Sequence, residues 1–509
     1  MSVLKLTFRI GHTTLLAAAL AARLGANDDG ALRITHGVAS GDVTTHTAVV
    51  WSRASRAATM VVEYDADVHF GRPARARARS ASEADYTAQV RLTGLQPGTR
   101  YHYRVVFSDA TGVTTAPVAG SFQTAPVEAA PLRFVFGGDL GGQRYCRRPG
   151  VGYAIFGHMQ ALAPHFFIAN GDMIYADGTC PAERSPDWKN VPGDFPGIGD
   201  PTVDWTRVEE LYEVFWKHWR YNRADPHHEA FLRDVPIYAQ WDDHEVINDF
   251  GAAWPAWPSA LERPGFANVV RAGRAALFHY NPIEHPAEEP ERIYRAFQWG
   301  PDVDLLLLDA RSYRSPNDAV DLPDGHKTLL GREQLAWLKA RLAASRAVWK
   351  IVSSDVPLSV PTGWSAERFG RDGWANGQAA DYSSRTGFER ELLDLLKHLD
   401  ARNVDNVVFV VTDVHFPMNL RYELDLDGDG DTLLFHELVS GPLSAYRMQV
   451  PFQLDPTLRP TILYGEGDVF NFGFVEIQRD AGGVSHLSAD VRDDAGVVRP
   501  GSRLRLTPR

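Results

Sequence analysis

The sequence is poor in cysteine and methionine, with two and six of these residues in a chain of 509. A pair of cysteines in a chain of this length excludes a disulfide-rich scaffold. Neither Cys146 nor Cys180 stands in a Cys-x-x-Cys motif, which argues against the usual zinc and thiol-redox patterns. The two can form one disulfide bond or remain free thiols, or one of them can bind a metal ion.

Basic residues are also scarce: 52 Lys and Arg stand against 64 Asp and Glu, which gives a net charge of -12 at pH 7. This balance argues against nucleic acid or an anionic membrane as a partner of the whole surface. Beyond the N-terminus, no apolar run is long enough to cross a membrane. An anionic substrate would therefore need a local positive charge, which a metal ion can supply.

The N-terminus combines two basic residues with a short apolar run. Lys5 and Arg9 precede the apolar residues 15–22, and small residues follow. This order is typical of a secretory leader, and the run is too short to span a bilayer. We predict that residues 1–30 are a leader and that the protein is secreted or periplasmic. The alternative is an N-terminal helix of the mature protein.

The chain is long enough for two or more domains. Residues 33–123 have the sequence pattern of an all-β domain. They contain short β-branched and aromatic runs between turn formers. These runs predict strands at 47–53, 60–66, 88–95 and 101–109. The segment LTGLQPGTRYHYRV resembles the tyrosine corner of immunoglobulin-like and fibronectin type III sandwiches, in which Tyr101 would bond to the preceding turn. An ordinary hairpin is the alternative.

The texture changes after residues 124–133, which are rich in Pro and Ala and predict a linker. From residue 133 to 509, apolar strands alternate with amphipathic helices, most clearly at 208–219 and 332–345. Strands that are buried on both faces and separated by helices predict an α/β domain with covered sheets. The segment 177–206 is rich in Pro, Gly and Asp, which is typical of a loop at the rim of a site.

Five predicted strands end in residues that bind metals. These residues are Asp139, Asp172, Asp242, Asp243, His244, Asp355, Asp413 and His415. A single Asp in such a position more often caps a turn or a helix. In an α/β sheet, however, ligands bind at the carboxyl ends of the strands, and close carboxylates cannot all ionise without a counter-charge. Because no Lys or Arg stands beside them in sequence, we predict a metal centre, with two ions.

The series resembles the calcineurin-like metallophosphoesterases. Within them it is most similar to the PhoD-type alkaline phosphatases and the related phospholipase D-type phosphodiesterases. The matching motifs are HGVASGD (36–42), NGDMIY (170–175), WDDHEVIND (241–249), LLLLDARSYRS (305–315) and FNFGFVEI (470–477). The resemblance spans about residues 33 to 480. It implies a four-layer αββα metallophosphoesterase fold, preceded by a small fibronectin III or immunoglobulin-like sandwich.

The resemblance also implies a ligand set for an Fe³⁺ ion beside a divalent ion. The ferric ion would be held by Asp139, Asp172, Tyr175 and His415. Asp172 would bridge to the second ion, which Asp243 and Asp413 would bind. Calcium is the divalent ion expected, with Mn²⁺, Mg²⁺ and Zn²⁺ as alternatives. A phenolate and carboxylates suit ferric iron, and an all-oxygen position suits calcium, manganese or magnesium.

Tyr175 would then serve as a phenolate, and its alternative role is that of a packing aromatic. Many PhoD-type enzymes have a cysteine where this chain has Asp139, whereas the wider class has Asp. Cys146 lies seven residues after Asp139, and Cys180 lies eight after Asp172. If the strands before them are neighbours, both thiols lie on adjacent loops above the site. We therefore predict a disulfide at its rim, which is consistent with an oxidising compartment.

The implied reaction is hydrolysis of a phosphate ester by a metal-bound hydroxide. His244 is the candidate for protonating the leaving oxygen, and its alternative role is to orient Asp243. Glu245 and Asn248 would support these residues or cap a following helix. Asp242 and Asp355 could bind metal or lie behind the ligands. Arg311 could hold a phosphate oxygen or pair with Asp309.

The leading prediction is a secreted alkaline phosphatase or phosphodiesterase whose substrate is a small phosphate ester. A phospholipase D-like headgroup hydrolase is the alternative, for which Trp254 and Trp257 could form an apolar rim. A calcium-binding adhesion protein is a third reading. For it, DLDGDGD (425–431) resembles the start of a calcium loop, but position twelve is His436 instead of the usual Glu. A polar hairpin tip is the alternative for that segment.

Overall fold

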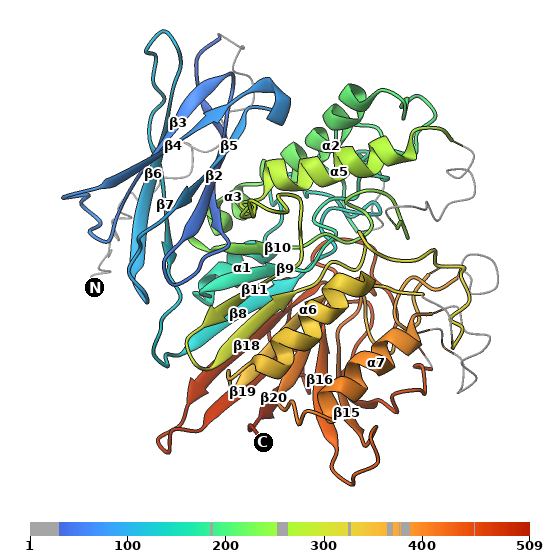
Figure 1. Ribbon diagram of the computed structural model, residues 1–509. Helices are drawn as coiled ribbons and strands as arrows, with labels where there is room; N and C mark the ends of the chain where they lie inside the picture. Colours follow the sequence, from blue (N-terminus) through green and yellow to red (C-terminus); the bar gives the residue numbers. More distant parts are fainter. Residues whose placement is uncertain are drawn as a thin grey trace, which may run out of the picture.

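The structure is a computed structural model. It describes residues 30–183, 187–251, 263–323, 327–363, 370–375, 377, 387–451 and 453–509. The proposed leader, Trp254 and Trp257 therefore lie outside the described residues. Two large sheets pack face to face, with helices on the outer face of each, and a smaller sheet lies at the N-terminal end (Figure 1).

The first large sheet combines the two ends of the chain with its middle. Its order is β20 (Leu504–Leu506), β19 (Ser485–Asp493), β18 (Asn471–Arg479), β8 (Leu132–Gly137), β9 (Phe166–Ala169), β10 (Ile237–Ala239), β1 (Ile34–Gly41), β2 (Ala48–Ala54) and β5 (Thr87–Leu92). The strands β8, β9, β10 and β1 are parallel neighbours. The carboxyl ends of β8, β9 and β10 therefore meet at one edge.

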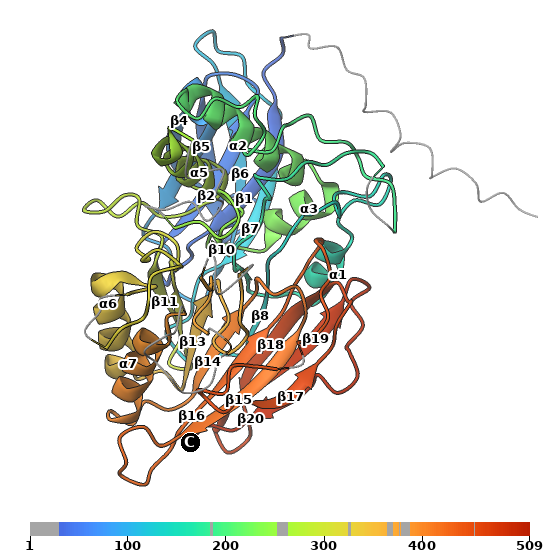
Figure 2. The ribbon, with the colours of Figure 1, turned by 90° about the vertical axis from the view of Figure 1, so that its right-hand side faces the viewer.

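The second large sheet carries the later strands. Its order is β11 (Arg295–Trp299), β12 (Val303–Leu307), β13 (Trp349–Ser354), β14 (Val407–Val411), β16 (Leu433–Val439), β15 (Met418–Leu424) and β17 (Thr461–Gly465). From β12 to β16 the neighbours are parallel. This sheet is covered by α6 (Gly331–Ala344) and α7 (Glu389–Asp400), which Figure 2 shows on one side of it.

Three hydrophobic layers hold these elements together. Between the sheets, Phe134 and Phe166 pack against residues such as Leu305 and Val408. The outer face of the first sheet packs against α1 (Ile155–Ala161), α2 (Val208–Arg223), α3 (Pro226–Asp234) and α5 (Phe266–Tyr280). Burial of apolar area on both faces of each sheet is the main favourable contribution to this arrangement. The predicted four-layer αββα architecture is confirmed.

The N-terminal region forms a sandwich. Its second sheet has the order β4 (Ala74–Ser80), β3 (Ala58–Asp65), β6 (Arg100–Ser108) and β7 (Val118–Gln123), and it shares a core with β1, β2 and β5. The hydroxyl of Tyr101 accepts a hydrogen bond from the backbone N–H of Gln96 at 3.0 Å, as expected for a tyrosine corner.

Two features of this region are absent from the sequence prediction. Strand β4 has the sequence ARARARS, without the aromatic and β-branched residues that mark a strand. Strand β1 pairs in parallel with β10 through Gly41 and Ile237, so one sheet continues from the sandwich into the α/β region. The boundaries 33–123, 124–133 and 133–509 stay a prediction.

Candidate metal centre

The strand ends that carry the predicted ligands converge from both large sheets. Asp139 follows β8, Asp172 follows β9 and Asp243 follows β10, while Asp413 and His415 follow β14. Four of these residues have a left-handed backbone, with φ values of 61° at Asp139, 52° at Asp172, 76° at Asp413 and 59° at His415. Non-glycine residues rarely adopt this conformation, and it concentrates where function constrains the backbone.

Two glycines allow the ligand turns to lie backbone against backbone. A Cβ on Gly138 would lie 2.3 Å from the carbonyl oxygen of Gly171, and a Cβ on Gly171 would lie 2.5 Å from the Cβ of Asp242. Any side chain at either position would push the turns apart. The glycines in FGGD and NGD therefore set the separation of the first three ligand loops.

Two groups of side chains share Asp172 and are close enough to hold metal ions. Ligand atoms of Asp139, Asp172 and His415 lie within 4.8 Å of one another, and so do those of Asp172, Asp243 and His244. Asp172 belongs to both groups, as a bridging ligand must. Asp243 also forms a group of this kind with Asp249 and Asp372. The hydroxyl of Tyr175 lies 3.0 Å from Nε2 of His415, and this nitrogen lies 3.6 Å from Oδ1 of Asp139.

Several carboxylate oxygens of this centre lack a hydrogen-bond donor. Both oxygens of Asp139, Oδ1 of Asp243 and Oδ2 of Asp413 are buried and accept no hydrogen bond from the described residues. A buried carboxylate without a partner is strongly destabilising. Cations would satisfy these oxygens, and carboxylate, phenol and imidazole donors fit hard metal ions. The acidic and histidine groups thus form a metal site.

The pKa values of the side chains at this centre also reflect their burial and the repulsion between neighbouring carboxylates. Burial, followed by the charge of neighbouring carboxylates, raises the pKa of three side chains well above its usual value: Asp139, Asp172 and Asp413. Burial and then the charge of Asp172 raise the pKa of Tyr175 in the same way. Burial lowers the pKa of His415 to about 4, which favours the neutral imidazole that binds metals. Positive charge at the centre would reverse the shifts of the acidic groups.

His244 has a carboxylate partner that the sequence prediction missed. Its Nδ1 lies 2.7 Å from Oδ1 of Asp177, and the other oxygen of Asp177 accepts the backbone N–H of Asn248 at 3.0 Å. Burial lowers the pKa of His244, but the charges of Asp177 and Asp243 outweigh burial and raise it to about 10. Asp177 stands five residues after Asp172 in NGDMIYAD, which is the signal that could have indicated it.

Glu245 ties two of the ligand turns together. Its carboxylate accepts the backbone N–H groups of Asp172 at 2.9 Å, Met173 at 2.7 Å and Asp242 at 2.8 Å. The side chain is fully buried. The described residues 246–251 that follow Glu245 form no helix, so its carboxylate supports the ligand turns. Hydrogen bonds to an ionised acceptor are stronger than neutral ones, and these three fix the turns after β9 and β10 relative to each other.

Comparison with known proteins agrees with this geometry. The family model described as "PhoD-like phosphatase" matches residues 134–474, and the model of its N-terminal domain matches residues 18–126. The chain belongs to the PhoD-like phosphatase family. It is 26% identical over 444 residues to "Alkaline phosphatase D" of Bacillus subtilis (strain 168), across 81% of this chain and 69% of that protein.

Two solved structures share the fold. "Structure of PhoD" matches with a TM-score of 0.72 and 20% identity, and covers 95% of this chain and 90% of that one. A purple acid phosphatase, PPD1, from seeds of yellow lupin (Lupinus luteus) matches with a TM-score of 0.57 and 16% identity, over 94% of this chain and 74% of that one. Its membership of this family, together with the Bacillus relative, makes the PhoD-like chain a hydrolase, a phosphoesterase of the metallophosphoesterase type.

In this PhoD-like phosphatase, Arg311 lies behind the metal site and not at a surface. It is fully buried. Its guanidinium lies 2.5 Å from Asp242 and 2.6 Å from Asp372, and Asp355 is 4.0 Å away. Asp309 instead accepts the backbone N–H of Arg311 at 3.2 Å. The expected Arg311–Asp309 side-chain pair is thus wrong.

Arg311 also corrects the inference that metal ions alone neutralise the strand ends. Asp242 has this cationic partner, and Arg314 lies 3.1 Å from Asp372. The sequence could not indicate these pairs, because Arg311 follows Asp242 by 69 residues and precedes Asp372 by 61. Asp242 and Asp355 therefore differ from the ligand residues: they face a guanidinium.

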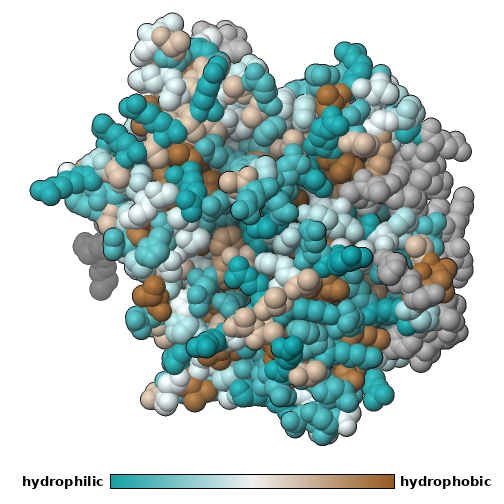
Figure 3. All heavy atoms as spheres, in the orientation of Figure 1, coloured by the Kyte–Doolittle hydropathy of each residue, from teal (hydrophilic) through white to brown (hydrophobic). Residues whose placement is uncertain are grey.

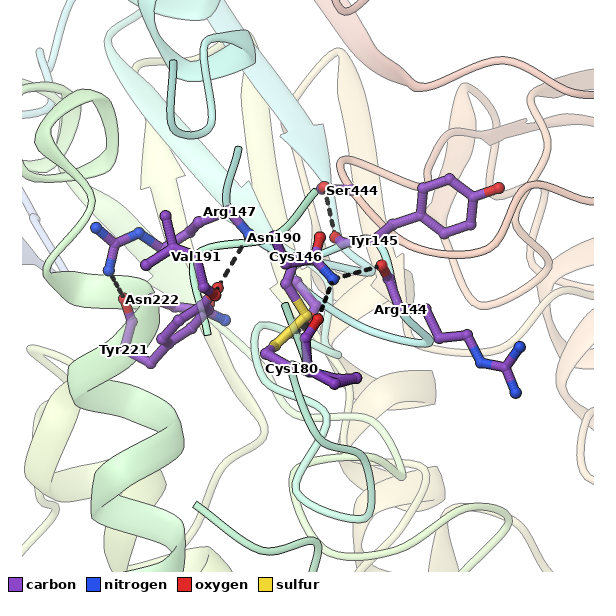
Figure 4. The surroundings of a disulfide bond; sticks show 12 residues. Arg144, Tyr145, Cys146, Arg147, Cys180, Asn190, Val191, Tyr221, Asn222 and Ser444 are labelled. Atoms are coloured by element: carbon purple, nitrogen blue, oxygen red, sulfur yellow. Dashed lines mark hydrogen bonds between the residues drawn. A yellow bond between two sulfur atoms is a disulfide. The ribbon is translucent and has the colours of Figure 1, made fainter. Parts of the chain in front are cut away.

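Cys146 and Cys180 are joined in a disulfide bond (Figure 4). They lie on the loops after β8 and β9, which are neighbouring parallel strands. The side chain of Asn190 donates to the carbonyl of Arg144 at 3.0 Å, and the hydroxyl of Ser444 donates to that of Tyr145 at 2.8 Å. The disulfide bond therefore connects the segment 177–206, which contains Cys180, to the loop that follows Asp139, which contains Cys146.

The DLDGDGD segment connects β15 and β16, which pair as an antiparallel hairpin. Asp425, Asp427 and Asp429 each accept a backbone N–H from within the segment, at 2.7 to 3.2 Å. Carboxylate oxygens of Asp400, Asp425 and Asp427 come within 4.8 Å of one another. Both Asx-type bonding and the position at a hairpin tip are features of a polar turn.

Within the described part of the chain, no helix is long and apolar enough to cross a membrane. On the face shown in Figure 3, hydrophilic side chains predominate and hydrophobic ones stand in small separate groups. This distribution is normal for the surface of a globular protein.

Proposed function

We propose that this protein is a secreted phosphoesterase that hydrolyses phosphomonoesters, phosphodiesters or both at a site with two metal ions. The observation that carries the proposal is the convergence of buried carboxylates from the ends of β8, β9, β10 and β14, with oxygens of Asp139, Asp243 and Asp413 that accept no hydrogen bond from the described residues. The name of the Bacillus relative supports phosphate ester hydrolysis. Secretion is supported by the leader-like N-terminus and by the disulfide bond, which is typical of oxidising compartments.

The proposed ligand set extends the two groups of side chains described above by Tyr175 and Asp413, and it gives His244 a role in proton transfer instead of metal binding. Asp139, Asp172, Tyr175 and His415 would hold Fe³⁺, and Asp172, Asp243 and Asp413 would hold a divalent ion, for which we propose Ca²⁺. When bound, such a pair of ions supplies positive charge to the phosphoryl oxygens. It also lowers the pKa of a water molecule, so that hydroxide is available to attack phosphorus.

The residues around the metals would position the reaction. Glu245 holds the turns of Asp172 and Asp242 in place through three backbone hydrogen bonds. His415 is oriented by the hydrogen bond between its Nδ1 and the carbonyl of Tyr446, which leaves Nε2 toward Tyr175 and Asp139. His244, fixed by Asp177, would donate a proton from its ring to the leaving oxygen.

Metal removal tests the proposal. We expect chelation to abolish hydrolysis of 4-nitrophenyl phosphate and bis(4-nitrophenyl) phosphate, because the carboxylates alone cannot stabilise the charge of the phosphoryl group. Fe³⁺ together with Ca²⁺ should restore turnover, and elemental analysis should find both. Phosphatidylcholine, assayed in parallel, measures the phospholipase alternative. Turnover by metal-free protein would contradict the proposal, and no turnover of any ester by the fully metallated protein would favour the adhesion alternative.

Esters with different leaving groups can show whether His244 donates a proton to the leaving oxygen or only orients Asp243. We expect His244→Gln to lower kcat about 10²-fold for phenyl phosphate esters, whose leaving oxygen needs a proton, and much less for 4-nitrophenyl esters. Steady-state kinetics on both esters measure this difference. Asp177→Asn should lower kcat in the same pattern as His244→Gln, with the larger loss for the phenyl ester. An equal loss for both esters would indicate that His244 only orients Asp243.

A further inference from the structure

A cavity of about 430 Å³ opens beside the metal site. Asp413 and His415 line one side of it, together with Asn248 and Asp249 from the loop after β10. Its volume lies within the range of roughly 300–1,000 Å³ that is usual for small-molecule sites. A phosphoryl group held at the metal site would therefore direct one of its substituents into this cavity.

One wall of the cavity is attached to a metal-site residue. His415 contacts the segment of residues 446–448 twice: its Nδ1 bonds to the carbonyl of Tyr446, and its own carbonyl accepts the backbone N–H of Met448 at 3.0 Å. Between these positions, Arg447 pairs with Asp187 and Asp468, each at 2.9 Å. These hydrogen bonds and ion pairs hold the wall beside the metal site, which lowers the cost of ordering it when a substrate binds.

The lining combines apolar and uncharged polar side chains. Its apolar members are Val360, Pro361, Val414, Phe416, Met448 and Pro451, and its uncharged polar members include Gln143, Asn248, Thr362, Tyr446 and Gln449. Met448 is 46% exposed, so its side chain is accessible from solvent. The described lining residues include no lysine or arginine, and the acidic ones are Asp249 and Asp413, of which Asp413 is a proposed metal ligand. An anionic substituent would meet no cationic Lys or Arg side chain here and would lie near the carboxylate of Asp249, which is unfavourable, whereas an uncharged apolar group would bury area against the apolar members.

We propose that this cavity binds an uncharged, apolar substituent of the phosphate ester, an aryl or alkyl group, and that it selects against esters with a second anionic group in that substituent. This inference rests on the proposed function, because it places the phosphoryl group at the metal site. Met448 is the specificity-determining residue that can be tested most directly, because it is accessible and its backbone is fixed by His415.

The test compares diphenyl phosphate with bis(4-carboxyphenyl) phosphate, by release of the phenol. Both esters are symmetric, so the same group enters the cavity whichever oxygen leaves. We expect wild-type protein to prefer the phenyl ester in kcat/KM by about tenfold or more. Met448→Lys should reduce this ratio by about fivefold or more, because it adds an opposite charge, and Met448→Glu should increase it.

Val484→Lys is the matched control. Val484 is an exposed apolar residue in the hairpin between β18 and β19, and the substitution adds the same charge to the molecule. Its ratio should equal that of the wild type. A wild-type ratio near one, or a ratio that does not follow the sign of the charge at residue 448, would overturn the inference and leave the proposed function standing. If wild-type, metal-loaded protein hydrolysed neither these diesters nor 4-nitrophenyl esters, the proposed function would fail as well.

Discussion

Asp172→Asn should lower kcat/KM for phosphate esters by at least about 10³-fold, since removal of a single preorganised stabilising group already costs about 10²–10³ in kcat. Asp172 contributes to both groups of metal-binding side chains. Asparagine has the same shape and one neutral acceptor oxygen, so the hydrogen bond that Asp172 accepts from the backbone N–H of His244 at 3.0 Å can persist. The fold should therefore remain, while the proposed bridge between two ions would be lost.

Metal content and thermal stability supply the other measurements. Elemental analysis should find fewer than two ions per chain in Asp172→Asn. The gain in melting temperature that wild-type protein shows on metal addition should shrink, because only bound ions stabilise the native state. Asp480→Asn is the matched control, since Asp480 lies in the β18–β19 hairpin, and it should behave like the wild type. Two bound ions and unchanged hydrolysis in Asp172→Asn would remove the basis of the proposed site.

Arg311→Met should reduce the free energy of unfolding by about 3–5 kcal/mol, the usual cost of breaking a buried ion pair from one side. The guanidinium is fully buried between Asp242 and Asp372. Methionine fills similar space but leaves these carboxylates without their main counter-charge. The loss should be measured by chemical unfolding of metal-free protein, so that metal binding does not contribute to the difference.

Two further variants isolate the cause. Asp372→Asn combined with Arg311→Met should recover part of the loss, because it removes one of the uncompensated charges. Arg421→Met breaks a pair with Glu423 whose side chains are 40% and 47% exposed, and it should cost no more than about 1 kcal/mol. If Arg311→Met kept its stability but raised KM for phosphate esters about tenfold, Arg311 would hold substrate instead.

The strand ends show what local sequence can predict. An apolar run followed by Gly and Asp, as at Asp139 and Asp172, predicts both a buried strand and a turn. Because ligands bind at the carboxyl ends of strands in an α/β sheet, these residues are predicted to lie close together. The order of sheets did not need to be known for that prediction. The same argument holds for Asp413 and His415 after β14.

The partners of those residues were not predictable in the same way. Asp177 and Glu245 lie near predicted residues in sequence, but the contacts that define them reach across turns from two different strands. Strand β4 lacks intrinsic strand formers and is held by pairing with β3 and by the sandwich core. In each case tertiary context decided what local propensity left open.

By itself, the sequence determined the α/β class, the tyrosine corner at Tyr101 and the acidic residues that converge, because each of these depends on contacts close along the chain or on strand polarity. Only the tertiary structure decided that Arg311 neutralises Asp242 and Asp372, that β1 pairs with β10 in the first large sheet, and that a cavity without Lys or Arg among its described lining residues opens beside His415. Those features arise where segments distant in sequence are in contact, and the packing of the two sheets and their helices determines which segments these are.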